Sequence, residues 1–471
     1  MLLIAAQGGA SRAGYWTGEV LAQLDAQTGG DIRPHIFAIN AVSGGGVGAT
    51  GYVSLLEDAR AKGARDHLNR LCAKTPTEQR IAACQADDKE LRARLQTITG
   101  RDALGPTMAV TMFSDLLYRF VPLPWFPDRA AALEGAWEAA WREACHGMAC
   151  YDRDLFAKPF LDLGADAPDG TSATDDWVPH LIIQGVHQES GDRILTSRLD
   201  FQEGDAVNAK DFFEHMPRDI FVSTAIHNGA RFPYVSPAGM MLDGTEQKRV
   251  TGHIVDGGYF DGSGVETLRE VGEAILASRK PVRPDRIVFV LIGYEAVTTA
   301  EDEDDGKPID EARLNELFAP LEAGWNARAG LGRQMMLNLA EFVSPTISKC
   351  PSVEMASTEA GEDGAKSGSQ EASEEGQSYP PHYQIRCGNI PDYAELHYVP
   401  IILCDPQAES KWRKHRVHMS WVVSNNVKSY VRSFTRDTGG GDAGAWSAPH
   451  ECKKRAGEAI EYIVDLLRPP R

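Results

Sequence analysis

The sequence predicts an α/β protein of three layers, in which helices cover both faces of a mostly parallel central sheet. Apolar runs of strand length recur along the chain, with helical stretches between several of them. Some of these runs are apolar on both faces, as a central strand covered on both sides requires. The strand-length runs are Leu2–Ala6, His35–Ile39, Leu181–Ile183, Ile220–Val222, His253–Val255, Ile287–Ile292 and Val399–Leu403.

The 471 residues are 42% hydrophobic and 24% charged, which excludes a disordered or fibrous chain, and we expect a single α/β domain over residues 1–471. Residues 56–160 lack strand runs and are rich in Ala and charge, so they predict a helical insertion. Residues 354–378 contain few large apolar side chains and predict an acidic mobile loop. Residues 380–471 predict a C-terminal extension with a strand, an amphipathic helix and a closing helix.

An aromatic segment lies inside the predicted insertion. Phe113–Trp125 contains Phe, Leu, Tyr and Trp side chains and is broken by Pro122 and Pro124. Such a segment could line a lipid-facing mouth or cap the core. A place in the core or a cap over it is the safer expectation, and the same segment is also the candidate for an interfacial surface.

The net charge is −19, with 48 basic and 67 acidic residues, and it excludes binding along a nucleic-acid backbone. Glu301–Glu311 and Glu354–Glu375 each hold seven acidic residues and one Lys, so they carry most of this charge. Acidic surface repels anionic lipid headgroups. Membrane contact would therefore need an apolar surface or a local basic patch.

The compartment stays open at this stage. No apolar window is long enough to span a bilayer and no signal-peptide pattern is present, so a cytoplasmic or peripheral-membrane protein is the default expectation. The chain begins directly with a strand run, which leaves room for a preceding segment. An extracytoplasmic site would follow if the eight cysteines pair locally, although free thiols fit equally well.

The cysteines occur as near neighbours. The four pairs are Cys72/Cys84, Cys145/Cys150, Cys350/Cys387 and Cys404/Cys452. Cys145, His146 and Cys150, or His415 and His418 near Cys404, lack the spacing of a zinc module. We expect no metal site.

The first motif follows the first strand run. Gln7-Gly8-Gly9-Ala10-Ser11-Arg12-Ala13-Gly14 places small residues between a strand and a helix, where backbone N–H groups and the helix dipole can hold an anion. The sequence has no dinucleotide or P-loop fingerprint. A purely structural turn would explain the same glycines.

The second motif follows the second strand run. Ala41-Val42-Ser43-Gly44-Gly45-Gly46 has the strand, sharp turn and helix order of a nucleophile elbow, with small residues two before and two after Ser43. A helix N-cap would also explain the serine, but it would not explain the run of glycines. We expect Ser43 to be a nucleophile.

A base is needed to activate that serine. The late histidines stand in no evident motif; they are His382, His397, His415, His418 and His450. A better candidate is Asp256, which ends a strand run and precedes Gly257 and Gly258. Asp261, followed by Gly262, is a rival five residues further on.

Taken together, these motifs resemble those of the patatin-like phospholipase family, whose enzymes use a Ser-Asp dyad. Ser43 matches the family's nucleophile and Asp256 its base. The oxyanion-hole positions match Gly8, Gly9 and Ala10, with Gly44 at the following helix, and the supporting positions match Arg12, Gly45, Gly257 and Gly258. Alanine replaces the family's glycine at Ala10, Ala13 and Ala41.

The resemblance extends beyond the three motifs. His180–Leu199 is similar to the family's strand-turn-strand segment, and Ser223–Pro233 is similar to its helix that ends in Phe-Pro. It covers residues 1 to 295 apart from the insertion and fades beyond them.

The resemblance implies a phospholipase A or lysophospholipase that needs no metal or organic cofactor and acts on a lipid or phospholipid substrate at a membrane surface. Asp256 would accept the serine proton, helped by a pKa that burial raises. Two alternatives remain. An acyltransferase of the malonyl type would need a His beside Ser43, where Val42 and Gly44 stand, and a catalytically silent lipid- or partner-binding module is favoured by the three alanines.

Overall fold

The computed structural model describes residues 1–61, 78–118, 120, 126–164, 177–201, 207–232, 235–244, 249–278, 284–294, 330–343, 395–403, 423–435 and 450–467. The two acidic stretches and the predicted loop at 354–378 lie outside the described residues. Within the described residues, no helix combines the length and the hydropathy that crossing a bilayer requires.

The described strands form one nine-stranded sheet. They are β1 (Leu2–Ala6), β2 (Ile36–Val42), β3 (His180–His187), β4 (Arg193–Ser197), β5 (Lys210–Asp211), β6 (Gly239–Leu242), β7 (Val250–Asp256), β8 (Arg286–Gly293) and β9 (Glu395–Ile402). The main order is β5-β4-β3-β2-β1-β8-β9, and the run from β3 to β9 is parallel. The predicted α/β class and mostly parallel sheet are confirmed.

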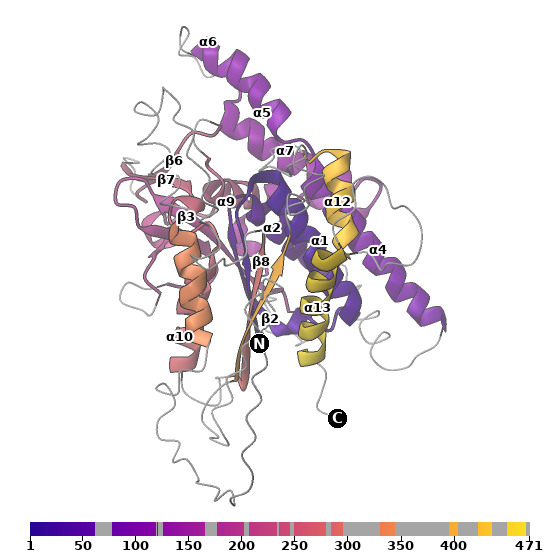
Figure 1. Ribbon diagram of the computed structural model, residues 1–471. Coiled ribbons are helices and arrows are strands. Elements are labelled where there is room, and N and C mark those ends of the chain that lie inside the picture. The colour runs from indigo at the N-terminus through magenta and orange to yellow at the C-terminus, as the bar shows by residue number, and fades with distance from the viewer. Residues whose placement is uncertain are drawn as a thin grey trace, which may run out of the picture.

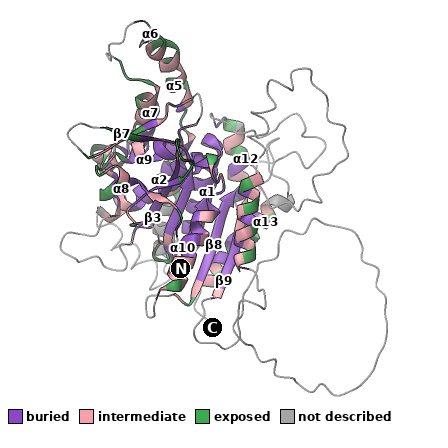
Figure 2. Ribbon diagram, turned by 90° about the vertical axis from the view of Figure 1, so that its left-hand side faces the viewer, coloured by how far each residue is buried: buried purple, intermediate pink, exposed green. Residues whose placement is uncertain are grey.

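Alternate residues of the central strands feed two separate cores, which makes the fold a three-layer sandwich. On β1, Leu2 and Ile4 pack into one core while Leu3 and Ala5 pack into the other. Figure 1 shows the helices on either side of the sheet, and Figure 2 shows the central strands in the colour of buried residues. Side chains on opposite faces of a pleated strand explain why these runs are apolar throughout.

Most of the described helices belong to the first of these layers. That layer contains α1 (Ala10–Thr28), α2 (Gly44–Ala61), α4 (Glu78–Gly100), α7 (Arg129–Ala144), α9 (Val222–Gly229), α12 (Asn425–Thr435) and α13 (His450–Leu467). The other layer contains α10 (Val265–Ala277) and the helix at residues 330–343. Helix α2 extends to Ala61 and so crosses the boundary expected at residue 56.

One of the expected strand segments forms the start of a helix instead. Ile220–Val222 is not a strand, because Phe221 makes only a single bridge to Pro159 and Val222 begins helix α9. Val222 and Ile226 are buried on one side of that helix, together with Ala225. A short apolar run fits a strand and the start of a buried helix equally well, and the tertiary contacts decide between them.

The prediction that Phe113–Trp125 caps the core is wrong for the part that the structure describes. Helix α5 (Leu104–Val110), a π-helical turn at Thr111–Asp115 and α6 (Leu116–Tyr118) form one rod that projects from the body (Figure 1). Phe113 and Phe120 are 76% and 78% exposed. Trp125 lies outside the described residues.

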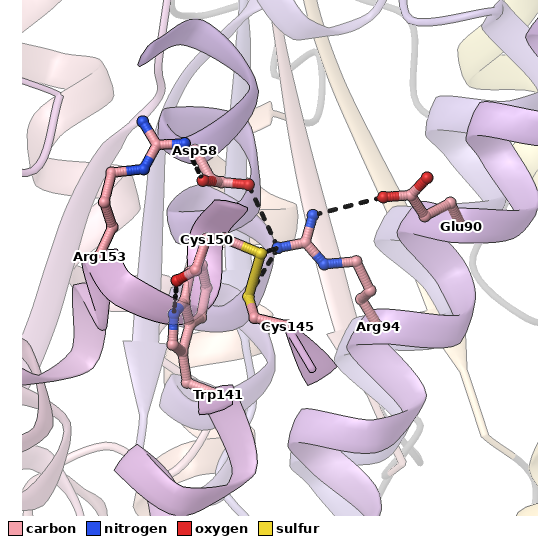
Figure 3. Close-up of a disulfide and its surroundings, with 7 residues drawn as sticks. All are labelled: Asp58, Glu90, Arg94, Trp141, Cys145, Cys150 and Arg153. Atoms are coloured by element: carbon pink, nitrogen blue, oxygen red, sulfur yellow. Dashed lines mark hydrogen bonds and ion pairs between the residues drawn. A yellow bond between two sulfur atoms is a disulfide. The ribbon is translucent and has the colours of Figure 1, made fainter. Parts of the chain in front are cut away.

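Of the four cysteine pairs, the structure describes both side chains of one. Cys145 and Cys150 form a disulfide that is wholly buried. Arg94 of α4 donates from Nη2 to both sulfur atoms at 3.0 Å and lies 3.3 Å from the Asp58 carboxylate (Figure 3). This cluster joins the end of α7 to α4 and α2, and it removes Cys145 and Cys150 as thiolate ligands for a metal.

Candidate active site

Two strands meet end to end along one edge of β3. Strand β2 runs parallel to β3 and ends with Val42 opposite Gln184. Strand β7 runs antiparallel to β3 and ends with Asp256 opposite Gly185, the very next residue. The last residues of β2 and β7 are therefore neighbours, although they are more than two hundred residues apart in the chain.

This arrangement brings Ser43 and Asp256 together. The Ser43 hydroxyl donates to Asp256 Oδ2 at 2.7 Å, and both side chains are buried. Ser43 has a φ of 49°, in the left-handed region that a non-glycine residue enters at a cost of about 1–2 kcal/mol. That strain turns the chain sharply between strand β2 and helix α2, as a nucleophile elbow requires.

The end of helix α9 holds both members of this pair by their backbones. The Ser43 N–H donates to the Gly229 carbonyl at 3.1 Å, and the Asp256 N–H donates to the Arg231 carbonyl at 3.2 Å. The Gly258 N–H donates to Asp256 Oδ1 at 2.8 Å, so the carboxylate is fixed at both oxygens. The relative position of the two side chains therefore depends on the last residue of α9 and on the short segment that follows it.

The glycines of the second motif let α1 and α2 pack in backbone contact. A Cβ on Gly44 would stand 1.8 Å from the Ala10 carbonyl oxygen, and one on Gly45 would stand 2.5 Å from the Ala6 carbonyl oxygen. A Cβ on Gly48 would likewise meet the Gly14 carbonyl oxygen at 2.3 Å. The N-termini of two helices thus converge beside Ser43, and their dipoles favour negative charge there.

The candidate oxyanion-hole residues divide into two groups. The Gly8 N–H donates to the Gly262 carbonyl at 2.9 Å, so it supports the turn and is not available as a donor to a ligand. Ala10 begins α1 and Gly44 begins α2, in the first turn, where N–H groups have no partner within the helix. Gly9 immediately precedes α1 at a φ of 155°. These three residues can supply the donors.

The alanine at position 10 keeps the backbone shape that glycine would give. Ala10 has a φ of 55°, so the substitution costs conformational energy but retains the N–H group. Gly9 is closely covered by the Tyr294 ring. The buried Arg12 guanidinium lies over the same ring, with its carbon 4.4 Å from the ring centroid. The Tyr294 ring thus packs against the turn, and Arg12 packs against that ring.

The remaining supporting glycine tightens the loop after Asp256. A Cβ on Gly257 would stand 2.0 Å from the Gln184 carbonyl oxygen. The Gln184 side chain donates to the carbonyls of Gly257 and Asp261 at 3.3 and 3.0 Å. Gln184 thus holds the loop closely against β3, and this fixes the position of the Asp256 carboxylate that precedes the loop.

A pocket opens above Ser43, and half of its lining residues come from the 56–160 region. Its other lining residues include Val47 of α2 and Ala230 beside α9. The described residues from the 56–160 region in the wall are Ile98, Thr99, Arg101, Ala103, Leu104, Leu133 and Trp137. The wall beside the candidate nucleophile is thus mainly apolar, and α4, α5, α7 and the link between α4 and α5 supply half of it.

The rival base Asp261 and the described histidine His397 have other partners. The Asp261 carboxylate accepts from the Ser263 N–H and hydroxyl and from the Glu266 N–H, so it fixes the start of α10. Burial raises the pKa of Asp261, although these hydrogen bonds oppose the shift. Of the late histidines, the structure describes the side chain of His397, which contacts the Tyr462 hydroxyl at 2.8 Å.

A second polar chain near the pocket was not expected from the sequence. Ser236 Oγ hydrogen-bonds to His227 Nε2, and His227 Nδ1 lies 2.7 Å from Glu134 Oε1. The order serine, histidine and acid is that of a catalytic triad, but Ser236 is buried and does not line the pocket above Ser43. The chain ties α7 of the inserted region to α9, which holds Ser43 and Asp256.

The hydrogen-bonded series of Ser236, His227 and Glu134 should make folding stability depend on pH. Burial lowers the pKa of His227 below its ordinary value of 6.5, with Arg231 acting in the same direction and Glu134 against it. As the pH falls below about 6.5 the unfolded chain takes up a proton that the folded chain refuses, so stability falls by at most about 1.4 kcal/mol per pH unit. We expect His227→Gln to flatten this slope in chemical denaturation.

At about pH 8 histidine is neutral in the folded and unfolded states. The difference in unfolding free energy between wild type and His227→Gln at that pH therefore reports the hydrogen bonds that the variant loses. Wild type and variant should converge as the pH falls from there. Identical slopes between about pH 5 and 7 would show that His227 does not carry the effect.

No metal centre is evident among the described residues, where no three His, Cys, Asp or Glu side chains are grouped as ligands.

No protein-family model matches the chain, and no curated protein matches it in sequence. Among solved structures, the chain is similar to VipD from Legionella pneumophila, with 10% identity and a TM-score of 0.23. The similarity covers 65% of this chain and 52% of VipD, so the chain spans about half of that protein's length. A TM-score this low carries no argument about activity.

Proposed function

We propose that this protein is a lipid acyl hydrolase of the phospholipase A or lysophospholipase type. One observation carries the proposal: the hydroxyl of Ser43, strained at a strand-to-helix turn, donates to the buried carboxylate of Asp256 at 2.7 Å. A hydrogen bond between a serine and a base, beside two helix N-termini, is the arrangement that acyl transfer needs.

The proposed reaction proceeds in two halves. Asp256 takes the proton of the Ser43 hydroxyl as the oxygen attacks the ester carbonyl, and N–H groups of Gly9, Ala10 and Gly44 stabilise the oxyanion. The carbonyl re-forms, the bond to the leaving alcohol breaks, and Asp256 returns the proton to that alcohol. Water then attacks the acyl-serine by the same steps, which releases the fatty acid and restores the Ser43 hydroxyl.

The mainly apolar lining supports a substrate with an acyl chain, and the pocket, of about 30 Å³, would have to widen to admit one. Leu104, Leu133 and Trp137 offer apolar contact, and Arg101, the one charged side chain among the lining residues, is paired with Glu143. We therefore propose a lipid ester as substrate and assign the described inserted helices a role in shaping the acyl site.

The serine can be tested against the second polar chain, which provides a matched control. Ser43→Ala should abolish both fatty-acid release from phospholipid vesicles and labelling by a fluorophosphonate, because both reactions need the nucleophile. Ser236→Ala, which also removes a buried hydroxyl with a neighbouring base, should retain both. Far-ultraviolet circular dichroism would confirm that the two variants are folded.

The opposite pattern, with labelling lost in Ser236→Ala and kept in Ser43→Ala, would overturn the proposal. If the wild type neither releases fatty acid nor reacts with the probe, the catalytically silent module is the better description. If the acyl group passes to an added alcohol in preference to water, the protein is an acyltransferase.

A further inference from the structure

The rod formed by residues 104–118 together with Phe120, hereafter the arm, exposes its apolar side to solvent. Its five large exposed apolar residues are Met112, Phe113, Leu116, Leu117 and Phe120. The first four positions are spaced i, i+1, i+4 and i+5, so they lie along one side of the helical rod, and Phe120 follows in the turn after it. Figure 2 shows exposed residues on this arm, which stands clear of the buried body.

The polar side of the arm faces the protein. Asp115 forms an ion pair with Arg129 at the start of α7, and the Arg129 N–H also donates to Asp115 Oδ1 at 3.3 Å. An ordinary surface helix buries its apolar side and exposes its polar side. The arm does the reverse, and Phe126 near the base of α7 adds a further exposed aromatic ring.

The charge of this region selects among possible partners. In the sequence, residues 104–126 contain one Asp and one Arg, so the region is neutral within a chain of net charge −19. An anionic surface, or a second copy of this acidic chain, would be repelled by the rest of the molecule. A zwitterionic phospholipid surface carries no net charge and accepts an apolar helix side.

The arm is also continuous with the candidate active site. Leu104, its first residue, and the adjacent Ala103 line the pocket above Ser43. The base of the arm thus borders the pocket, and the exposed apolar side lies further along the same rod. We propose that the arm inserts its apolar side into a zwitterionic phospholipid surface and delivers lipid to Ser43, an inference that rests on the proposed function.

The test measures binding separately from turnover. In the Ser43→Ala background, co-sedimentation with phosphatidylcholine vesicles is compared before and after adding Phe113→Ser and Phe120→Ser. Removing two rings that enter the interface should weaken binding about tenfold or more. The control adds Leu331→Ser and Leu337→Ser, two exposed apolar residues on the helix at 330–343, and should bind as the parent does.

Each result decides the proposal. Failure of the parent to bind phosphatidylcholine, or equal binding by the arm variant, overturns it. A change from dimer to monomer in the arm variant, measured by light scattering, also overturns it, because the arm would then hold a second copy. With Ser43 intact, the arm variant should hydrolyse a soluble short-chain ester at the normal rate. Vesicle binding by a protein that hydrolyses no ester would remove the proposed function and leave the arm's affinity for lipid standing.

Discussion

Asp256→Asn is expected to lower the rate of ester hydrolysis by about 10²–10⁴-fold, the usual contribution of a general base. Asparagine has nearly the same shape and can still accept the hydrogen bond that the Gly258 N–H donates to Asp256 at 2.8 Å. It cannot take up the proton of Ser43, so attack on the ester loses its base. The loss should appear in kcat, measured with a soluble ester and normalised to folded protein.

Asp261→Asn is the matched control for that measurement. Asp261 is equally buried and lies five residues away, but its carboxylate contacts Ser263 and the Glu266 N–H at the start of α10. We expect that variant to lose stability while its folded fraction keeps normal kcat. A large loss of kcat in Asp261→Asn together with near-normal turnover in Asp256→Asn would reverse the assignment of the base.

Gly44→Ala is expected to lower the free energy of unfolding by about 3 kcal/mol or more, at the upper end of what overpacking costs. The added methyl would stand 1.8 Å from the Ala10 carbonyl oxygen, an atom of the main chain that no side-chain rotation can move. Helices α1 and α2 would have to separate, which also displaces the N–H donors beside Ser43. Urea denaturation and ester hydrolysis should therefore both report the damage.

Gly46→Ala tests whether the effect depends on position or on glycine alone. A Cβ there would lie 3.7 Å from the Ile183 side chain, an ordinary van der Waals contact. Since alanine also favours the helix more than glycine, stability should stay the same or rise by up to about 1 kcal/mol. Equal destabilisation by both variants would mean that backbone contact between α1 and α2 is not what requires Gly44.

The strands and the sharp turn at Ser43 could be predicted because their signals are local. A buried parallel strand must be apolar on both faces, as Ile287–Ile292 is, and a sharp turn into a helix needs small residues like those after Ser43. The adjacency of Ser43 and Asp256 could only be expected by resemblance. It depends on where β2 and β7 end along β3, a register that composition does not encode.

Other features depend on contacts that a sequence does not display. The hydrogen bond that the Gly8 N–H donates to the Gly262 carbonyl joins two loops that are far apart in the sequence. The chain from Ser236 through His227 to Glu134 likewise joins α9 to an inserted helix. The exposure of Phe113 contradicts the general tendency of large aromatic side chains to be buried. The ion pair of Asp115 with Arg129, together with the exposed fractions of the apolar side chains, shows which side of that helix faces outward.

The end-to-end meeting of β2 and β7 on β3 has a consequence for how the chain folds. The two side chains of the dyad are separated by 213 residues, so closing that loop precedes any catalytic geometry. Contacts of such high sequence separation form slowly compared with the helices on either side. The return of the proposed esterase activity during refolding would thus time the completion of the sheet, at a stage when helical circular dichroism has already returned.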